Sequence, residues 1–215
     1  MTALIALFWR DLKRAWGSGA LWLPVLFFLL VAIAFPFAVG PDVPLLRRAG
    51  GGMLWVAALL AALLPIDRLV RPDRDAGVLD QLAVRGFADE VIAAVKIAAH
   101  AIGFGLPLLI ALLPAAALLG QDGGRVTLVA TGLAIAIPAL ASLAVLSAAL
   151  TAGLRGGSAI GGLLILPLAV PLLIFGAGML DPSGRGAIKL LAAVSLLLTM
   201  IGPFAAGAAL RGLRE

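Results

Sequence analysis

The chain has 215 residues, of which 63% are hydrophobic, and its mean hydropathy is +1.16. Soluble domains are usually about 45 to 50% apolar, so this composition excludes a soluble protein and indicates an integral membrane protein. The net charge of +5 does not indicate nucleic-acid binding, because the basic residues flank apolar runs, where they set membrane orientation.

The first predicted element is an amphipathic helix over residues 2–16. A step of about 100° per residue separates an apolar face from a basic face. The apolar face holds Ile5, Trp9, Leu12 and Trp16, and the basic face holds Arg10, Lys13 and Arg14. Residues 1–19 are therefore predicted to be an interfacial segment that lies on the bilayer. A cleaved signal peptide is the alternative, but the charges follow the apolar run and no small-residue cleavage site precedes the first span.

Six apolar runs follow, each long enough for a helix to cross about 30 Å of hydrocarbon. The predicted spans are 20–39, 50–66, 91–119, 126–152, 158–180 and 188–210. A short loop that carries Arg47 and Arg48 is expected before the second span. Prolines inside the spans predict kinks whose freed carbonyls need packed neighbours. The whole chain, 1–215, is therefore predicted to be one all-α transmembrane domain.

The distribution of basic residues predicts the orientation of this domain. Six spans place both ends of the chain on the same side of the membrane as the polar stretch 67–96. Of the 16 Lys and Arg residues, 11 fall on that side and five on the other. The positive-inside rule therefore predicts that both termini and the polar stretch are cytoplasmic.

The polar stretch 67–96 holds 11 of the 27 charged residues. Its loop, residues 67–90, is predicted to be a cytoplasmic coupling segment that docks on a soluble partner, because the flanking spans offer no polar surface. A short amphipathic helix is expected there, capped by Asp75 and ended by Gly86, while Asp89 and Glu90 cap the next span. The predicted docking residues are Asp75, Gly77, Val78, Leu79, Asp80, Gln81 and Leu82. A solvated loop is the alternative.

Motifs that carry catalytic chemistry are missing from the sequence. There is one histidine, no cysteine, no phosphate-binding glycine loop, no nucleophile elbow and no zinc-protease motif. The protein is therefore predicted to be no enzyme, to hold no cofactor or metal, and to take its energy from another chain. His100 lies four residues after Lys96 on the same helix face, and a packing histidine is favoured there over a haem ligand.

Several strings of residues match a known family in their order and spacing along the chain. They are Phe35-Pro36, Gly40-Pro41-Asp42, Trp55-Val56-Ala57-Ala58-Leu59-Leu60, Asp67-Arg68-Leu69, Asp75-Ala76-Gly77-Val78-Leu79-Asp80-Gln81-Leu82, Lys96 with His100, 166–175, Pro203-Phe204 and Ala208-Ala209-Leu210-Arg211. On these strings the chain resembles the CcmB (haem exporter protein B) family, the ABC-transporter permeases of cytochrome c maturation. It departs from that pattern at Asp67 and Asp80, where the family more often has glutamate, and in lacking a proline near Gly51.

The resemblance implies a six-span permease of the bacterial inner membrane that pairs with a cytoplasmic ABC ATPase subunit. It also implies a haem-handling membrane subunit as a partner and, indirectly, a periplasmic haem chaperone whose loaded form is released by ATP hydrolysis. A membrane scaffold that assembles these subunits without transport is the alternative function. The lipid bilayer is an expected partner, and nucleic acid is not.

Overall fold

A computed structural model describes residues 2–17, 19, 22–40, 42–154, 157–181, 184 and 186–214. Over these residues the chain is helical and contains no strand. The helices are α1 (Thr2–Gly17), α2 (Trp22–Val39), α3 (Val43–Leu63), α4 (Ile66–Leu69), α5 (Arg71–Asp75), α6 (Val78–Val84), α7 (Asp89–Leu118), α8 (Gly123–Thr151), α9 (Gly157–Gly178) and α10 (Ala187–Gly212). The all-α prediction is confirmed.

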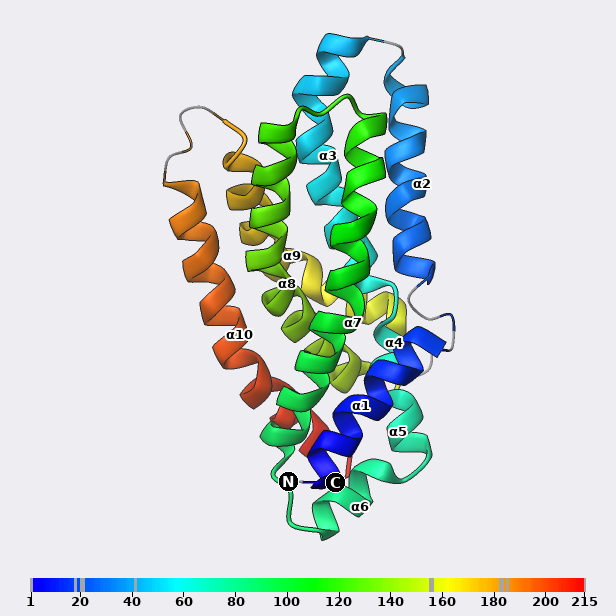
Figure 1. The fold of residues 1–215 in the computed structure, drawn as a ribbon. Coiled ribbons are helices and arrows are strands. Elements are labelled where there is room, and N and C mark those ends of the chain that lie inside the picture. The colour runs from blue at the N-terminus through cyan, green and yellow to red at the C-terminus, as the bar shows by residue number, and fades with distance from the viewer. Residues whose placement is uncertain are drawn as a thin grey trace.

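The long helices α2, α3, α7, α8, α9 and α10 run side by side along the molecule (Figure 1). The short helices α4, α5 and α6 gather at one end, together with α1 and both ends of the chain. Five helices, namely α2, α3, α7, α8 and α10, are long and apolar enough to cross a membrane. The apolar part of α9 that was assessed, Ile165–Gly178, is shorter. The described residues thus give a multi-pass membrane protein with five candidate spans.

The first, third, fourth and sixth predicted spans agree with helices long and apolar enough to cross a membrane. The fifth, residues 158–180, coincides with α9, which is not among the five candidate spans of the described residues, so the predicted count of six is not confirmed. The second predicted span differs from the observed helix. α3 begins at Val43, well before the predicted start, and contains Arg47 and Arg48, so the prediction of a loop at these arginines is wrong. The helix starts early because the carboxylate of Asp42 accepts a hydrogen bond from the backbone N–H three residues later, at 3.1 Å. Pro44 also suits a first helical turn, where its missing N–H costs nothing.

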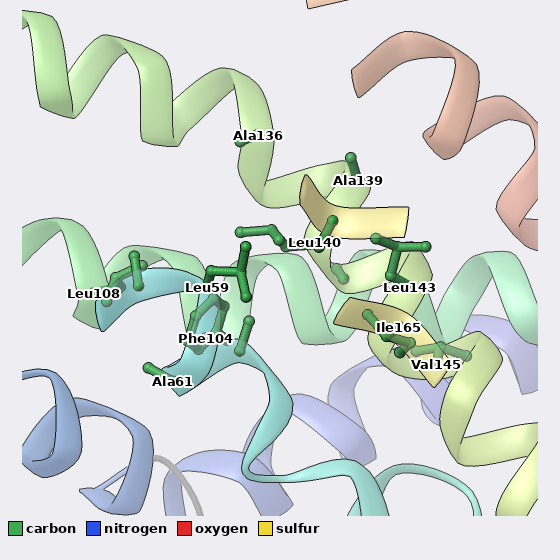
Figure 2. Close-up of a cluster of buried hydrophobic side chains, with 14 of the residues drawn as sticks. Leu59, Ala61, Phe104, Leu108, Ala136, Ala139, Leu140, Leu143, Val145 and Ile165 are labelled. Carbon is green, nitrogen blue, oxygen red and sulfur yellow. The ribbon is translucent and has the colours of Figure 1, made fainter. Parts of the chain in front are cut away.

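The core lies where α3, α7, α8 and α9 meet, and α8 is the most enclosed of the candidate spans. Figure 2 shows side chains from these four helices in contact there, among them Leu59, Phe104, Leu108, Leu140, Leu143 and Ile165. Many core positions on α3 and α8 are alanine, which lets the helix backbones approach closely. Association of helices in a bilayer depends on such close van der Waals packing, because lipid removes the hydrophobic driving force.

Trp55 of α3 is the largest fully buried side chain and fills the space between three helices. Its ring lies against Gly132 of α8 and Gly176 of α9, and a Cβ atom at Gly132 would lie only 2.6 Å from the ring. These two positions therefore have no room for a side chain. The contacts fix how α3 packs between α8 and α9.

Candidate functional site

The coupling segment, residues 67–90, folds into most of α4, α5 and α6, joined by tight turns. α6 begins at Val78 because Gly77 adopts a left-handed backbone with φ of 66°, which glycine tolerates without strain. Gly86, with φ of 79°, ends the helix as predicted, and its N–H donates to the Ala83 carbonyl at 2.8 Å. The structure thus has a seven-residue helix in this segment, while its coupling role stays a prediction.

The cap predicted at Asp75 is wrong, whereas the one predicted at Asp89 and Glu90 is confirmed in position, at the positive end of α7, but not as a hydrogen bond. Asp75 is exposed at the end of α5, where it lies 3.9 Å from Arg71, and α6 has no side-chain cap. α7 also lacks a side-chain cap, although Asp89 and Glu90 occupy its first turn. The acidic residues of α7 are instead ion-paired with the end of α10.

The predicted docking residues divide into a buried group and an exposed group. Leu79 and Leu82 are only 2% and 7% exposed, because the apolar face of α6 packs on the core of this same chain. The expectation that these two leucines face a groove on a partner is therefore corrected. Gly77 and Val78 are half-buried, whereas Asp75, Asp80 and Gln81 are exposed.

One exposed apolar residue of α6 was missed by the sequence analysis. Val84 is 89% exposed on the outer side of this short helix. Its neighbour Arg85 is also exposed. The outer face of α6 thus carries Asp80, Gln81 and Val84, and none of these belongs to the core of this chain.

A buried ion cluster attaches the coupling segment to the bundle. Asp73 of α5 has a side chain only 3% exposed, and three cations contact it. Lys96 of α7 pairs with its Oδ2, Arg10 Nη2 lies 2.6 Å from the same oxygen, and Arg14 Nη1 lies 3.1 Å from Oδ1. We call Arg10, Asp11, Arg14, Asp73 and Lys96 the Asp73 cluster.

Lys96 is the centre of the Asp73 cluster and is itself only 3% exposed. Besides Asp73, its Nζ donates to Asp11 Oδ2 at 3.1 Å and to the Leu69 carbonyl at 3.0 Å. A buried ammonium is stable only when its protons find such acceptors. The cluster therefore joins four elements, because Asp11 lies in α1, Leu69 in α4, Asp73 in α5 and Lys96 in α7.

The charges of the cluster favour the ionised forms of Asp73 and Arg10. Burial would raise the pKa of Asp73, but the charges and hydrogen bonds of Lys96 and Arg10 outweigh it and hold that pKa below its usual value of 3.8. Burial would likewise lower the pKa of Arg10, yet the carboxylates of Asp11 and Asp73 outweigh it and raise that pKa above its usual value. The attachment of α1 is thus an electrostatic one.

This attachment should respond to acid in a defined direction. A depressed carboxyl pKa contributes stability that is present above the unfolded value, 3.8, and is lost as the pH falls through the folded value. A spin label on a Lys13→Cys variant should therefore keep one mobility from pH 8 to pH 5 and become more mobile only below about pH 4. The sequence has no other cysteine, so the label is unique. A mobility change centred near neutral pH would contradict this assignment.

Sequence reasoning missed the Asp73 cluster, although Lys96 gave a signal. A lysine followed by an apolar helix needs a buried anion, yet the sequence does not show which of the Asp residues supplies it. Asp11 lies 85 residues from Lys96 along the chain. Only the packing of α1 across α7 brings the two together.

Two further contacts hold the same end of the bundle. Arg74 of α5 donates to the Ala152 carbonyl at the end of α8, at 3.3 Å. At the start of α7, Glu90 lies 2.5 Å from Arg211 Nη2, and Asp89 pairs with Arg214. The coupling segment is thus connected to α1, α7 and α8, and the start of α7 is connected to the end of α10.

A cavity of about 420 Å³ opens beside the Asp73 cluster, between α1, α2, α4, α5 and α7. Charged residues, among them Asp11, Arg68 and Lys96, line one part of it. His100 and Phe104 of α7 line another part, and the two rings stack with centroids 5.6 Å apart. The cavity therefore combines cationic and apolar walls.

His100 is 8% exposed, and its Nε2 has no hydrogen-bond partner among the described residues. The stacking on Phe104 agrees with a packing role, while the bare Nε2 leaves one ring nitrogen available to a ligand. Among the described residues, no three His, Asp or Glu side chains are grouped so as to hold a metal ion. The absence of haem binding through His100 stays a prediction.

The sequence of this chain matches one family model and several curated proteins. A family model described as "CcmB protein" matches residues 2–212. The chain is 43% identical to "Heme exporter protein B" of Bradyrhizobium diazoefficiens, over 98% of each chain. It is 41% identical to the protein of that name from Paracoccus denitrificans, over 96% of this chain and 97% of the relative. For the Escherichia coli K12 protein the identity is 37%, over 95% and 98%.

Proposed function

The chain belongs to the CcmB family, and we propose that it is the membrane permease subunit of an ABC transporter complex in cytochrome c maturation. In this proposal it contributes to haem handling, and a cytoplasmic ABC ATPase drives release of a loaded periplasmic haem chaperone. A haem-handling membrane subunit completes the complex in the bacterial inner membrane. The relatives' name, which specifies haem export, supports the haem-related role.

The observation that carries the proposal is the construction of the coupling segment. Its inner side is fixed to α1, α7 and α8 through Asp73 and Arg74, while the outer face of α6 is exposed. A rigidly attached helix with a free outer face suits a part that receives force from a partner. The ATPase docks, in this proposal, on the exposed residues Asp75, Asp80 and Gln81 of the predicted docking set, together with Val84.

The proposed mechanism passes through these attachments. Closure of the ATPase pair around nucleotide pushes α6, and α5 moves with it because the two short helices are in contact. The ion pair between Asp73 and Lys96 transmits the displacement to α7, and the bond from Arg74 transmits it to the end of α8. α7 then tilts relative to α10. In this mechanism Leu79 and Leu82 hold α6 against the core of the bundle.

This proposal is tested by following α7 during the nucleotide cycle. Spin labels at Leu113→Cys in α7 and Leu197→Cys in α10 occupy exposed positions. The distribution of distances between the two labels in the assembled complex should change when ATP is added. It should not change when the complex contains an ATPase variant that binds ATP but cannot close around it. A pair at Leu190 and Leu197, both exposed and both in α10, serves as a matched control. An ATP-independent distance with normal assembly would favour the scaffold function instead.

The proposed orientation gives a separate prediction. With six crossings, both termini and the coupling segment are cytoplasmic, while Asp42, Asp122 and Asp181 face the periplasm. Single cysteines at Ala76, beside α6, and at Arg48, in α3, are both exposed. An impermeant maleimide added to intact spheroplasts should label Arg48→Cys and leave Ala76→Cys unlabelled until the membrane is opened. Labelling of Ala76→Cys from outside would reverse the orientation and remove the docking proposal.

A further inference from the structure

We propose that this chain binds an anionic phospholipid from the leaflet beside the coupling segment. The phosphate enters the cavity next to the Asp73 cluster, and an acyl chain lies in an apolar groove between α2 and α7. This site is independent of the proposed ATPase docking, which uses the outer face of α6. Four observations carry it, namely the groove, its position next to the cavity, the charge of the cavity and the bare nitrogen of His100.

The groove has a volume of about 470 Å³ and lies further along α7 from the coupling segment than the cavity does. Its walls are apolar throughout and come from the end of α1, from α2 and from α7. Trp22 and Ile110 on these walls are 64% and 63% exposed, so the groove is open at the side of the bundle. In a bilayer an open apolar groove on a spanning helix faces hydrocarbon chains.

The groove and the cavity adjoin at three places. Neighbouring residues of α1 line them, Ala15 in the cavity and Trp16 in the groove. The same is true of Pro24 and Val25 in α2. Along α7 the cavity lining ends at Phe104 and the groove lining begins two residues later. The pair of sites therefore forms one path with a polar end and an apolar end.

The direction of this path matches a lipid in the leaflet. At about 1.5 Å per residue, Ile110 lies about 15 Å from His100 along the helix axis, deeper in the membrane. Trp16 and Trp22, at the junction, have the side chain that prefers the interface between headgroups and hydrocarbon. A ligand with a charged head and a long apolar tail fits this order, whereas a soluble anion leaves the groove unused.

The cavity favours an anion as the head. Arg14, Arg68 and Lys96 line it against the carboxylates of Asp11 and Asp73, and Arg10 adds a positive charge to the same carboxylates. Arg68 has no ion pair within the part of the chain that the structure describes. Basic pockets between membrane helices on the cytoplasmic side of a bilayer, where the proposed orientation places this cavity, recognise the phosphates of anionic lipids.

His100 supplies a further contact for such a head. Buried polar atoms are paired in nearly all proteins, and the Nε2 of this buried residue is not paired within the described chain. A phosphate presents several acceptor oxygens, which can bond an imidazole N–H and a guanidinium together. The lipid phosphate would therefore satisfy His100 and Arg68 at once.

The site is tested on the full chain in detergent with brominated lipids, whose acyl chains quench nearby tryptophan fluorescence. The quenching due to Trp22 is obtained by difference from a Trp22→Phe variant. Brominated phosphatidylglycerol should quench this signal at about five-fold lower lipid content than brominated phosphatidylcholine, as expected when one arginine meets a head of net negative charge in place of a zwitterionic head. Arg68→Gln should abolish the difference, and Arg71→Gln, an exposed cation outside the cavity, should preserve it.

Three results would overturn the proposal. The first is equal quenching by the two lipids, and the second is an equal effect of Arg68→Gln and Arg71→Gln. The third comes from adding haemin in place of lipid. An absorption band that needs His100 and haemin that displaces phosphatidylglycerol would identify a porphyrin as the occupant of the cavity.

Discussion

Replacing both Leu79 and Leu82 with aspartate should prevent the chain from accumulating in the membrane, whereas Val84→Asp should leave its abundance unchanged. The difference follows from burial, because both leucines belong to the core and Val84 is 89% exposed. Each buried leucine contributes about 1.5 to 3 kcal/mol. An unpaired carboxylate in its place adds a desolvation cost of several kcal/mol. The free energy of unfolding of a typical domain is roughly 5 to 15 kcal/mol, so the double variant should lose most of its stability.

The same comparison separates folding from docking. At matched membrane abundance, Val84→Asp should recover about tenfold less ATPase subunit in a pull-down, as expected for loss of a central contact. Asp67→Asn, an exposed change in α4 away from α6, serves as a control. The docking proposal fails if Val84→Asp retains the ATPase as well as the control does. The burial argument fails if the double leucine variant accumulates normally.

The leucines of α6 show what a single sequence reveals about an amphipathic helix and what it leaves open. The spacing of Val78, Leu79 and Leu82 predicts an amphipathic helix, and that helix is present. The spacing does not say which surface covers the apolar face, because a groove on this chain and a groove on a partner require the same pattern. Here this chain covers it, so the free surface is the polar face with Val84.

The spanning helices were predictable for a physical reason. Crossing hydrocarbon requires about 20 apolar residues in one run, and that requirement is local in the sequence. The start of α3 was missed because the hydropathy of residues 43–49 is interrupted by Arg47 and Arg48, although Asp42 and Pro44 already form a helix-start signal. Capping chemistry was the better guide than hydropathy at that boundary.

The Asp73 cluster could not be predicted, because its members come from elements that are distant in the sequence. Arg10 lies 63 residues from Asp73, and Lys96 lies 23 residues from it on the other side. Their meeting depends on α1 crossing α7, which no local pattern encodes. The one hint in the sequence was Lys96 itself. Burying an unpaired ammonium costs several kcal/mol, so a lysine at a buried position implies a carboxylate close by.

Removing the carboxylate that pairs with Lys96 should give the largest loss of stability that we expect from a single substitution in this chain. Asp73→Ala removes the main partner of a Lys96 side chain that is 3% exposed. Breaking a buried pair by removing one partner costs about 3 to 5 kcal/mol, because the remaining charge stays buried. The purified variant should therefore unfold at a clearly lower temperature, and a label at Lys13→Cys should report a more mobile α1, which retains the contact between Asp11 and Lys96 and the packing of Leu7. Asp75→Ala, which alters an exposed carboxylate two residues away, should change little.

The double variant Asp73→Ala, Lys96→Met decides whether the loss comes from the stranded charge. Methionine keeps most of the volume of lysine and needs no acceptor, so the second change should restore much of the stability lost in the first. It should not restore the attachment of α1, because Arg10 and Arg14 still lack Asp73 as a partner. ATP-dependent movement of α7 should then stay absent in a chain that is again stable. If the double variant is as unstable as Asp73→Ala alone, the energetics of the cluster lie with the arginines of α1 rather than with Lys96.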